Sequence, residues 1–341
     1  MKRNKFFRAT LIALCLLLLV GYFIPMPYYI SKPGMARELE PIVEVDQGYE
    51  DEAGSFMLTT IQMGKANIFT YALANVMSYW SIYDESDIKS DDESDDEYEM
   101  RQMYLMEGSK EKAIMSAFRS AGKEYEITYN GIYVYKVVED MPAENILLPG
   151  DRITKINHKK IESTEAFTNY ILEQSEGTEL ELEIIRENQT ISKTVAVKYN
   201  PDTGNVGIGI VLIDDIEVET DPKVTIDSSE IGGPSAGLMF SLEIYNQLVG
   251  EDVTKGYEIA GTGTIDEEGN VGAIGGIDQK VVAADKSGAE IFFAPNENGS
   301  ADSNYSVAAK TAKDIGTSMK IVPVDTMAEA LAYLEQLPEK E

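Results

Sequence analysis

Hydrophobic and polar positions alternate with two different periods along this chain, and both periods recur several times. Alternation at every second residue, or a short apolar run, predicts a β-strand, and apolar residues three or four positions apart predict an amphipathic helix. Strands are predicted at 54–61, 131–137, 152–157, 180–186, 193–197, 290–294 and 319–324. Helices are predicted at 66–80, 103–118, 164–174, 238–248 and 277–288, with a short helix from Met141 and another after Asp325. This order, which shows no internal repeat, indicates an α/β (α+β) fold.

The longest apolar stretch, 9–30, follows several basic residues between Lys2 and Arg8. Its length suits a helix that spans the hydrocarbon core of a bilayer. A cleaved signal peptide is the alternative, but the sequence around Ile24 offers no small-x-small cleavage site. Because basic flanks stay on the cytoplasmic side, we expect 1–8 to be a cytoplasmic tail and 9–30 an uncleaved transmembrane anchor in the cell membrane. Everything that follows the anchor would then lie outside the cytoplasm.

Net charge and cysteine content narrow the classes of partner. The 341 residues carry a formal net charge of −30, and 43% of them are hydrophobic. The apolar content is ample for packed cores, and the negative charge argues against nucleic acid and anionic membrane surfaces as partners. A single cysteine excludes an internal disulfide, so thiol usage does not set the compartment.

Residues 125–199 form a compact unit of strands around one short helix. The run from Leu148 to Asn157, Leu-Pro-Gly-Asp-Arg-Ile-Thr-Lys-Ile-Asn, and the helix capped by Ser163 resemble a PDZ domain. PDZ domains bind extended peptides by adding a strand to a sheet edge, often capturing the terminal carboxylate. The local Tyr-Asn-Gly-Ile departs from the Gly-Leu-Gly-Phe of that carboxylate loop. The resemblance nevertheless implies peptide binding at Asn130, Gly131, Ile132 and Tyr133.

A run of small residues from Gly232 to Gly237 surrounds Ser235. Pro234 has the fixed φ that suits a first helical turn, so Ser235 is predicted where a loop becomes a helix. Backbone N–H groups at this open end, those of Gly232 and Gly233, could hold a developing oxyanion. The alternative for this stretch alone is a Gly-Pro-Ser turn that merely begins a helix.

The residues present elsewhere exclude most partners for a serine nucleophile. Gly-Pro-Ser-Ala-Gly fits the G-x-S-x-G nucleophile elbow, but that fold places its histidine after the serine, and the only histidine, His158, precedes it. His158 is expected at an exposed hairpin tip. The only cysteine, Cys15, lies in the apolar N-terminal run, and no H-E-x-x-H or Cys/His cluster provides a zinc site. The base for Ser235 must therefore be a lysine or a carboxylate.

Lys280 is the candidate base for an electrostatic reason. It falls in the first turn of the helix that begins near Ile277, where the positive end of the helix dipole and apolar neighbours disfavour the ammonium form. Lowering a lysine pKa from about 10.4 to about 7.5 costs roughly 4 kcal/mol, which burial can supply. The alternative is a lysine whose ammonium reaches water along the helix surface.

Several sequence runs, in their order and spacing, resemble the Lon-type serine protease domain. They are Gly-Pro-Ser-Ala-Gly, Thr262-Gly-Thr-Ile, Gly269-Asn-Val, and Ile274-Gly-Gly followed by Lys280-Val-Val-Ala-Ala. The resemblance covers 200–338. It implies that Ser235 is the nucleophile, Lys280 its general base and Thr262 a hydroxyl that supports the lysine. The sequence contains no G-x-x-x-x-G-K-[ST] loop, so the ATPase that feeds substrate to Lon is missing. Cleavage of flexible or unfolded chains without ATP is expected, and Lon-type domains commonly assemble in rings, so a homo-oligomer is a further expectation.

Residues 31–124 are assigned to an N-terminal extracytoplasmic region. Its early strand at 54–61 could pack with the protease domain, which would make the PDZ domain an insertion. The segment 84–99 is rich in carboxylates and is expected to be a solvated loop. Calcium binding is the less favoured alternative, because the segment lacks the spaced ligands and glycine of an EF-hand. No metal ion and no cofactor are predicted.

The sequence therefore predicts an extracytoplasmic serine endopeptidase, held at the membrane, in which the PDZ domain recruits a peptide or unfolded protein. A catalytically inert PDZ scaffold that only binds peptides is the main alternative. An acyl-hydrolase that acts on other esters is a third, because a Ser-Lys pair fixes the nucleophile and leaves the substrate open.

Overall fold

The structure, a computed structural model, describes residues 24–49, 53–89, 93–161, 163–201, 203–228 and 231–340. Residues 9–23 of the predicted anchor lie outside these ranges. Within the ranges, no helix has the length and apolar character needed to cross a bilayer. The end of the predicted anchor, 25–30, belongs instead to a strand, β1 (Pro25–Glu38). The backbone of Tyr29 and Ile30 pairs with neighbouring strands on both sides, which fixes an extended conformation there.

One sheet organises the larger unit of the protein, in the order β18-β17-β14-β3-β1-β4. Its centre is parallel and consists of β3 (Ser55–Asn67), β14 (Glu258–Gly261), β17 (Ile291–Pro295) and β18 (Lys320–Val324). On one side β1 and then β4 (Ser81–Asp84) add in antiparallel fashion. The strand predicted at 54–61 is therefore an internal strand of this sheet, and a second unit is inserted after it in the chain.

Helices cover both faces of this sheet, because alternate residues of its parallel strands are buried on opposite sides. Phe56, Leu58 and Ile259 pack into one core with helices α4 (Asp95–Ser120), α6 (Gly237–Val249) and α9 (Met327–Glu335). Met57 and Ala260 pack into a second core with α7 (Ile277–Lys286) and α8 (Asn304–Ile315). The predicted helices at 238–248 and 277–288 are thus confirmed. Short elements complete the unit: β2 (Val43–Val45) paired with β13 (Val224–Ile226), β15 (Thr264–Ile265) paired with β16 (Val271–Gly272), and η1 (Glu297–Gly299).

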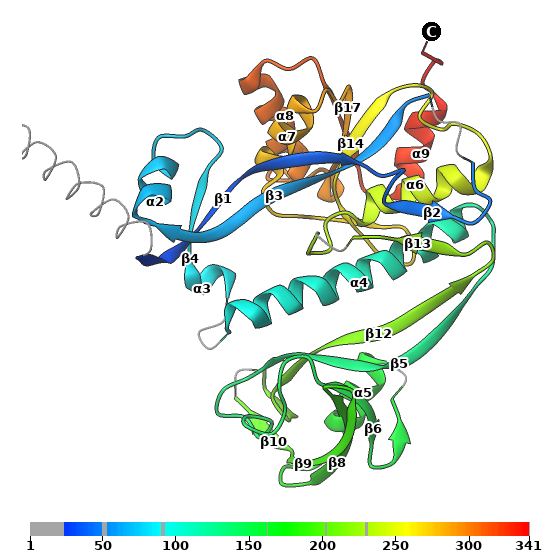
Figure 1. The fold of residues 1–341 in the computed structure, drawn as a ribbon. Helices are drawn as coiled ribbons and strands as arrows, with labels where there is room; N and C mark the ends of the chain where they lie inside the picture. Colours follow the sequence, from blue (N-terminus) through cyan, green and yellow to red (C-terminus); the bar gives the residue numbers. More distant parts are fainter. Residues whose placement is uncertain are drawn as a thin grey trace, which may run out of the picture.

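The inserted unit is a second sheet with its own hydrophobic core (Figure 1). Its strands run in the order β12-β5-β6-β8-β9, with β7 paired to β6. The bounds are β5 (Tyr125–Val137), β6 (Arg152–Ile156), β7 (Lys159–Lys160), β8 (Glu179–Arg186), β9 (Gln189–Ala196) and β12 (Ile210–Thr220). Helix α5 (Thr164–Leu172) packs on it, and β10 (Lys198–Asn200) pairs with β11 (Asn205–Gly207).

The sheet of this unit extends past the predicted boundary at residue 200, because β12 pairs with β5 along its length and Thr220 lies opposite Tyr125. One prediction for this unit was wrong. The short helix expected from Met141 is a series of turns, in which Asp140 and Asn145 adopt positive φ and interrupt any helical run.

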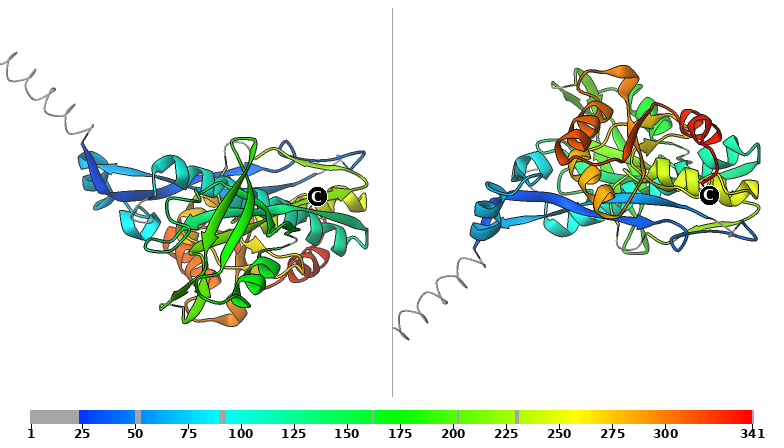
Figure 2. Two further views of the ribbon diagram at one scale, coloured as in Figure 1. Left: turned by 90° about the horizontal axis from the view of Figure 1, so that it is seen from below. Right: turned by 90° about the horizontal axis from the view of Figure 1, so that it is seen from above.

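Strands β1 and β3 run beyond the sheet as an arm that carries a small helix (Figures 1 and 2). That helix, α2 (Ile68–Ala74), is shorter than the predicted 66–80. It begins at the capping residue Asn67 and ends at Asn75, after which the chain turns back into β4. A small core of Ile30, Ala66 and Ala74, with Trp80 packed against it, holds α2 on the strands.

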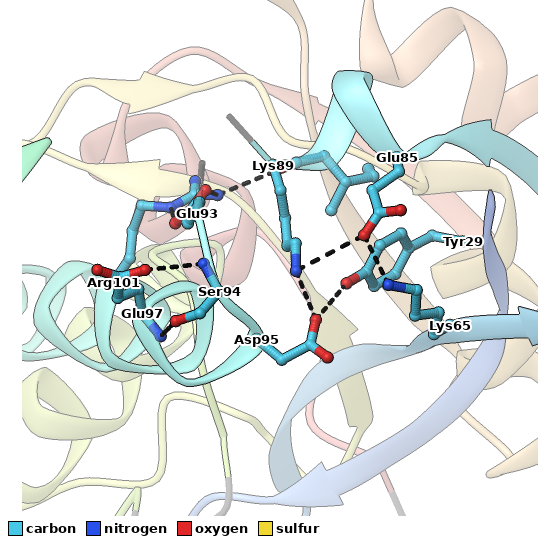
Figure 3. A network of polar contacts seen from close by, with 10 residues as sticks. Tyr29, Lys65, Glu85, Lys89, Glu93, Ser94, Asp95, Glu97 and Arg101 are labelled. Carbon is cyan, nitrogen blue, oxygen red and sulfur yellow. Dashed lines mark hydrogen bonds and ion pairs between the residues drawn. The ribbon is translucent and has the colours of Figure 1, made fainter. Parts of the chain in front are cut away.

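The acidic segment 84–99 is largely helical where it is described, which corrects the prediction of a solvated loop. It contains α3 (Glu85–Ile88) and the first turns of α4, where Ser94 and Glu97 form a capping box. Figure 3 shows the ion pairs that neutralise part of its charge, including Lys89 with Asp95 at 2.5 Å and Arg101 with Glu93 at 2.6 Å. Helix α4 is thereby fixed to the arm at one end, and it runs on between the two sheets (Figure 1).

Candidate active site

Two helix starts bring Ser235 and Lys280 together. Ser235 lies just before α6, whose first residue is Gly237, and Lys280 lies in the first turn of α7. The distance from Lys280 Nζ to Ser235 Oγ is 2.8 Å. Residues 45 positions apart in the chain are therefore within hydrogen-bond reach, as a nucleophile and its base require.

The amine of Lys280 has two further oxygen neighbours, each at 3.0 Å: the carbonyl of Thr59 and the hydroxyl of Thr262. A neutral amine has two hydrogens and one lone pair. The carbonyl can only accept, and the Thr262 hydroxyl already donates to the Ser235 carbonyl at 2.9 Å. Both amine hydrogens are thus taken, and the lone pair is left for the hydroxyl proton of Ser235.

Burial sets the charge of this lysine. Only 2% of the surface of Lys280 is exposed, and this burial lowers its pKa from 10.5 to about 7. Its neighbours are a carbonyl and two hydroxyls, and no carboxylate of the described residues pairs with it. A large fraction of Lys280 is therefore uncharged near neutral pH, as a general base must be.

The backbone that precedes α7 needs a glycine. Gly276 adopts a φ of 67°, and a Cβ added there would lie 3.0 Å from Ile61 Cγ2 of β3. The buried side chain of Gln279, in the first turn of α7, accepts a hydrogen bond from Ser31 of β1 at 2.5 Å. These contacts hold the first turn of α7 against the arm strands and so position Lys280.

Motif reasoning missed the carbonyl of Thr59, as well as Ser31 and Gln279. A carbonyl belongs to every residue, so no motif marks it. The sequence indicated Thr59 only indirectly, through the predicted strand at 54–61 and the hypothesis that this strand packs with the protease domain. Once β3 pairs with β14 in the observed register, Thr59 follows directly after Leu58, the partner of Gly261, and it reaches the lysine.

The predicted oxyanion donors are not both free in this conformation. The N–H of Gly233 donates to the carbonyl of Gln102 in α4 at 2.9 Å. A Cβ at Gly232 would lie 2.9 Å from Gln102 Cβ, so α4 covers this loop closely. The oxyanion role of Gly232 and Gly233 stays a prediction, and for Gly233 it requires that α4 release the N–H.

A groove runs beside Ser235 between α4, the β15–β16 hairpin and β12. It is lined by Leu105, Ser109, Ile213, Pro234, Ile265 and Val271, among others. A larger hollow lies at the opposite end of α6, where Tyr245 and Gly250 line it together with α9, and it is far from the dyad. Of these two hollows, the groove is the one that lies next to Ser235.

The predicted peptide site of the PDZ unit was wrong in its detail. Ile132 and Tyr133 lie in the middle of β5, with β12 on one side and β6 on the other. Asn130 and Gly131 belong to the same strand, and a Cβ at Gly131 would lie 2.5 Å from the carbonyl of Ile153. Because both edges of the strand are occupied at Ile132 and Tyr133, no peptide can add to the sheet at these two residues, and a role for Asn130 and Gly131 stays a prediction.

Other candidate residues lie apart from the site. His158 occupies the tight turn between β6 and β7, where its φ is 64° and its side chain is 84% exposed, as predicted. Across the described residues, no group of His, Cys, Asp and Glu is arranged to hold a metal ion.

Comparison with known families agrees with both domain assignments. Residues 222–336 match the Lon protease (S16) C-terminal proteolytic domain, and residues 113–197 match the PDZ domain. The PDZ domain of the SdrC-like protein from Listeria monocytogenes is 30% identical, with 26% of this chain and 93% of that chain covered and a TM-score of 0.25.

Curated relatives are Lon proteases. Identity is 34% over 102 residues with that of Mesomycoplasma hyopneumoniae (strain 232), 33% over 108 with that of Rhizobium meliloti (strain 1021) and 30% over 163 with that of Campylobacter jejuni. The alignments cover 30%, 31% and 44% of this chain but 11%, 12% and 19% of the relatives, so the chain spans less than a fifth of their length. These matches support a serine endopeptidase.

Proposed function

We propose that this chain is a membrane-anchored serine endopeptidase that cleaves peptides or flexible proteins outside the cytoplasm, without ATP. The observation that carries the proposal is the contact of 2.8 Å between Ser235 Oγ and a buried lysine whose other two neighbours take up its hydrogens. This arrangement leaves a basic lone pair beside a hydroxyl, which an inert scaffold does not need.

In the proposed reaction, Ser235 Oγ attacks the peptide carbonyl and passes its proton to Lys280 Nζ. The resulting ammonium then protonates the leaving amine as the acyl-enzyme forms. A water molecule gives its proton to the neutral lysine and hydrolyses the ester. Thr262 acts as a positioning residue, because it accepts from the lysine and holds the Ser235 carbonyl.

The oxyanion would be held by the N–H groups of Gly232 and Gly233. Since Gly233 now donates to Gln102, entry of a substrate strand must displace α4 from this loop. Displacement by substrate would couple binding to completion of the site.

Substrate recruitment is assigned to the PDZ unit through its edge strand β12 in place of β5. Three features support this edge. It lies at one end of the sheet order, α5 lies beside it with the N–H of Thr164 donating to Asp214 at 2.5 Å, and Ile213 of the same strand lines the groove next to Ser235. A peptide added to β12 would therefore extend toward the nucleophile.

Membrane anchoring and independence from ATP rest on sequence. The stretch 9–30 is long and apolar with basic residues before it, although its last six residues are already part of β1. The absence of a phosphate-binding loop from the sequence supports ATP-independent cleavage. Ring assembly, expected from the Lon resemblance, would be tested by the mass of the full chain in nanodiscs.

The test incubates the full chain in nanodiscs with unfolded protein and a peptide library, without ATP, and compares wild type with Ser235→Ala and Lys280→Arg. We expect cleavage by wild type alone, with products identified by mass spectrometry. Equal cleavage by all three proteins would reject the dyad. Peptide binding without cleavage would indicate the inert scaffold, and turnover of simple esters without peptides would indicate an acyl-hydrolase.

A further inference from the structure

The end of the arm carries large apolar side chains that no described part of the protein covers. They lie on α2, in the turn after it and directly before β1, and their exposed fractions range from 39% to 77%. We call this surface the apolar tip, and it consists of Ile24, Ile68, Phe69, Leu73, Val76 and Met77. Isolated exposed apolar residues are normal, but a cluster of this kind marks a contact surface.

Most of the apolar tip lies in a stretch without charged side chains, although the chain as a whole is highly charged. Residues 68–83 contain no Asp, Glu, Lys or Arg, whereas the whole chain has 59 acidic and 29 basic residues. Contact between the apolar tip and an acidic surface of another copy of this chain would gain no electrostatic stabilisation. A partner that is apolar itself fits the composition better.

The apolar tip is held rigidly in its exposed state. Asn67 caps α2 by accepting the N–H groups of Phe69 and Thr70, both at 3.0 Å. The opposite side of α2 is fixed to the arm, because Ala74 is buried there and the rings of Tyr28 and Tyr71 are 5.0 Å apart. The helix therefore presents its apolar side chains outward and does not fold them inward.

The place of the apolar tip in the chain indicates its partner. Pro25 pairs with Asn67, so Ile24 lies next to the first residue of α2. The residues immediately before Ile24 belong to the apolar stretch assigned to the membrane. Neighbouring strands are about 5 Å apart, so a bilayer that receives this stretch is within reach of α2.

We propose that the apolar tip inserts into the interfacial layer of the bilayer, as a second membrane contact beside the N-terminal anchor. The inference rests on the anchoring proposed above. With a net charge of −30, the contact depends on apolar burial and not on attraction to anionic headgroups. Two contacts fix an orientation where one leaves the protein free to turn, so the apolar tip sets the direction in which the catalytic groove faces.

The experiment places a fluorescent probe on the apolar tip of the full chain. Cys15→Ser removes the only native thiol, and Leu73→Cys or Val76→Cys then carries an environment-sensitive label. The protein is reconstituted in zwitterionic liposomes with or without spin-labelled lipid. Leu172→Cys, an equally exposed site on α5, is the matched control at 44% against 43% for Leu73.

We expect a blue-shifted emission at both tip positions and several-fold stronger quenching by the spin-labelled lipid than at Leu172→Cys. High salt should leave the quenching unchanged. Adding Phe69→Asp to the labelled Val76→Cys chain should reduce quenching to the control level. Quenching equal to the control at both tip positions would overturn the proposal, as would a blue shift without lipid quenching, which indicates a second copy of the chain or its own N-terminal segment on the surface.

Peptide cleavage and liposome flotation, measured on the same samples, separate this proposal from the proposed function. Cleavage that depends on Ser235 with an unquenched probe rejects the tip contact alone. A quenched probe without cleavage rejects the peptidase and keeps the contact. A chain that does not float with the liposomes rejects both membrane contacts and leaves the dyad untouched.

Discussion

Two buried lysines in this molecule have opposite charge behaviour. Lys89, at the foot of the arm, is 6% exposed, and Lys280, in the candidate active site, is 2% exposed. Burial acts to lower the pKa of Lys89, but its contacts with Asp95 at 2.5 Å and with Tyr29 raise it above the ordinary value (Figure 3). Lys280 meets only uncharged oxygens, and burial lowers its pKa to about 7.

This comparison shows that burial alone does not leave a lysine uncharged and able to accept a proton. What matters is whether the oxygens around it include a carboxylate. Lys89 is held charged, fixes α3 and α4 to the arm, and has no free lone pair. Lys280 retains the hydrogen bonds that position it, yet it can lose its proton near neutral pH.

Removing the amine should have the largest effect. Lys280→Met is expected to lower kcat/KM for peptide cleavage by about 10³-fold or more, because the base is lost. Lys89→Met, the matched change at the other buried lysine, should leave kcat/KM for a short peptide within a few-fold of wild type. Comparable loss in both variants would show that the effect comes from packing and not from base catalysis.

A carboxylate placed beside Lys280, as Asp95 lies beside Lys89, should keep both lysines charged at neutral pH. Thr262→Asp places a carboxylate beside the amine and is expected to raise the pKa of Lys280 by about 2 units or more. Peptide cleavage at pH 7 should fall by about 10²-fold and recover in part as the pH rises. Thr262→Val, which removes the hydroxyl without adding charge, should lower cleavage with no such upward shift of the pH profile.

Among the described residues, Glu111 has a pKa close to that of Lys280 and so confounds the pH profile. Burial raises the pKa of Glu111, on α4, to about 7, while the N–H of Val218 donates to it at 2.9 Å. Glu111→Gln removes that titration. A rise of activity through pH 7 that survives in Glu111→Gln belongs to Lys280, whereas a profile that becomes flat would assign the rise to α4.

The buried lysine should also make the fold less stable at neutral pH. The native pKa of about 7 lies below the unfolded value of 10.5. Between these values the unfolded state binds more protons, so the free energy of unfolding rises with pH from about 7 to about 10. The full cost below pH 7 is about 5 kcal/mol.

Lys280→Met removes this cost but leaves the Thr59 carbonyl without its donor. We expect a net gain of about 2 kcal/mol in the free energy of unfolding at pH 7, which shrinks toward pH 10. Thermal unfolding followed by circular dichroism across this range measures it. A variant less stable than wild type at every pH would contradict the depressed pKa.

The smallest effect is expected at the foot of the arm. Lys89→Met leaves Asp95 without its ion pair, but the Asp95 side chain is 63% exposed and water can solvate it. We expect only a small loss of stability, since exposed partners recover most of the interaction from solvent. Hydrogen exchange at the N-terminus of α4 should increase locally, and unchanged exchange would contradict the anchoring role of Lys89.

Local signals in the sequence were sufficient for both members of the dyad. Ser235 and Lys280 stand at helix starts that Pro234 and Gly276 mark, and the family motifs fix their order. Pairing across the sheet could not be predicted in the same way. The Thr59 carbonyl, the hydrogen bond from Ser31 to Gln279 and the covering of Gly233 by α4 all depend on segments that meet only in the folded protein.

The errors have the same origin. The PDZ residues Ile132 and Tyr133 were assigned by resemblance, and the strand order of the folded unit places them in its interior. The acidic segment was read from its charge, but Lys89 and Arg101 neutralise enough carboxylates for helices to form. In both cases, contacts with neighbouring segments determined the structure more than the composition of the segment itself did.

The buried amine of Lys280 is bound by residues from both sides of the inserted unit. Thr59 comes before the PDZ domain in the chain, whereas Ser235, Thr262 and Lys280 come after it. During synthesis, β3 therefore emerges from the ribosome long before β14, the strand beside which it must lie. A nascent chain that ends before Lys280 lacks one member of the proposed dyad, so the proposed activity is withheld until synthesis has passed this residue, long after β3.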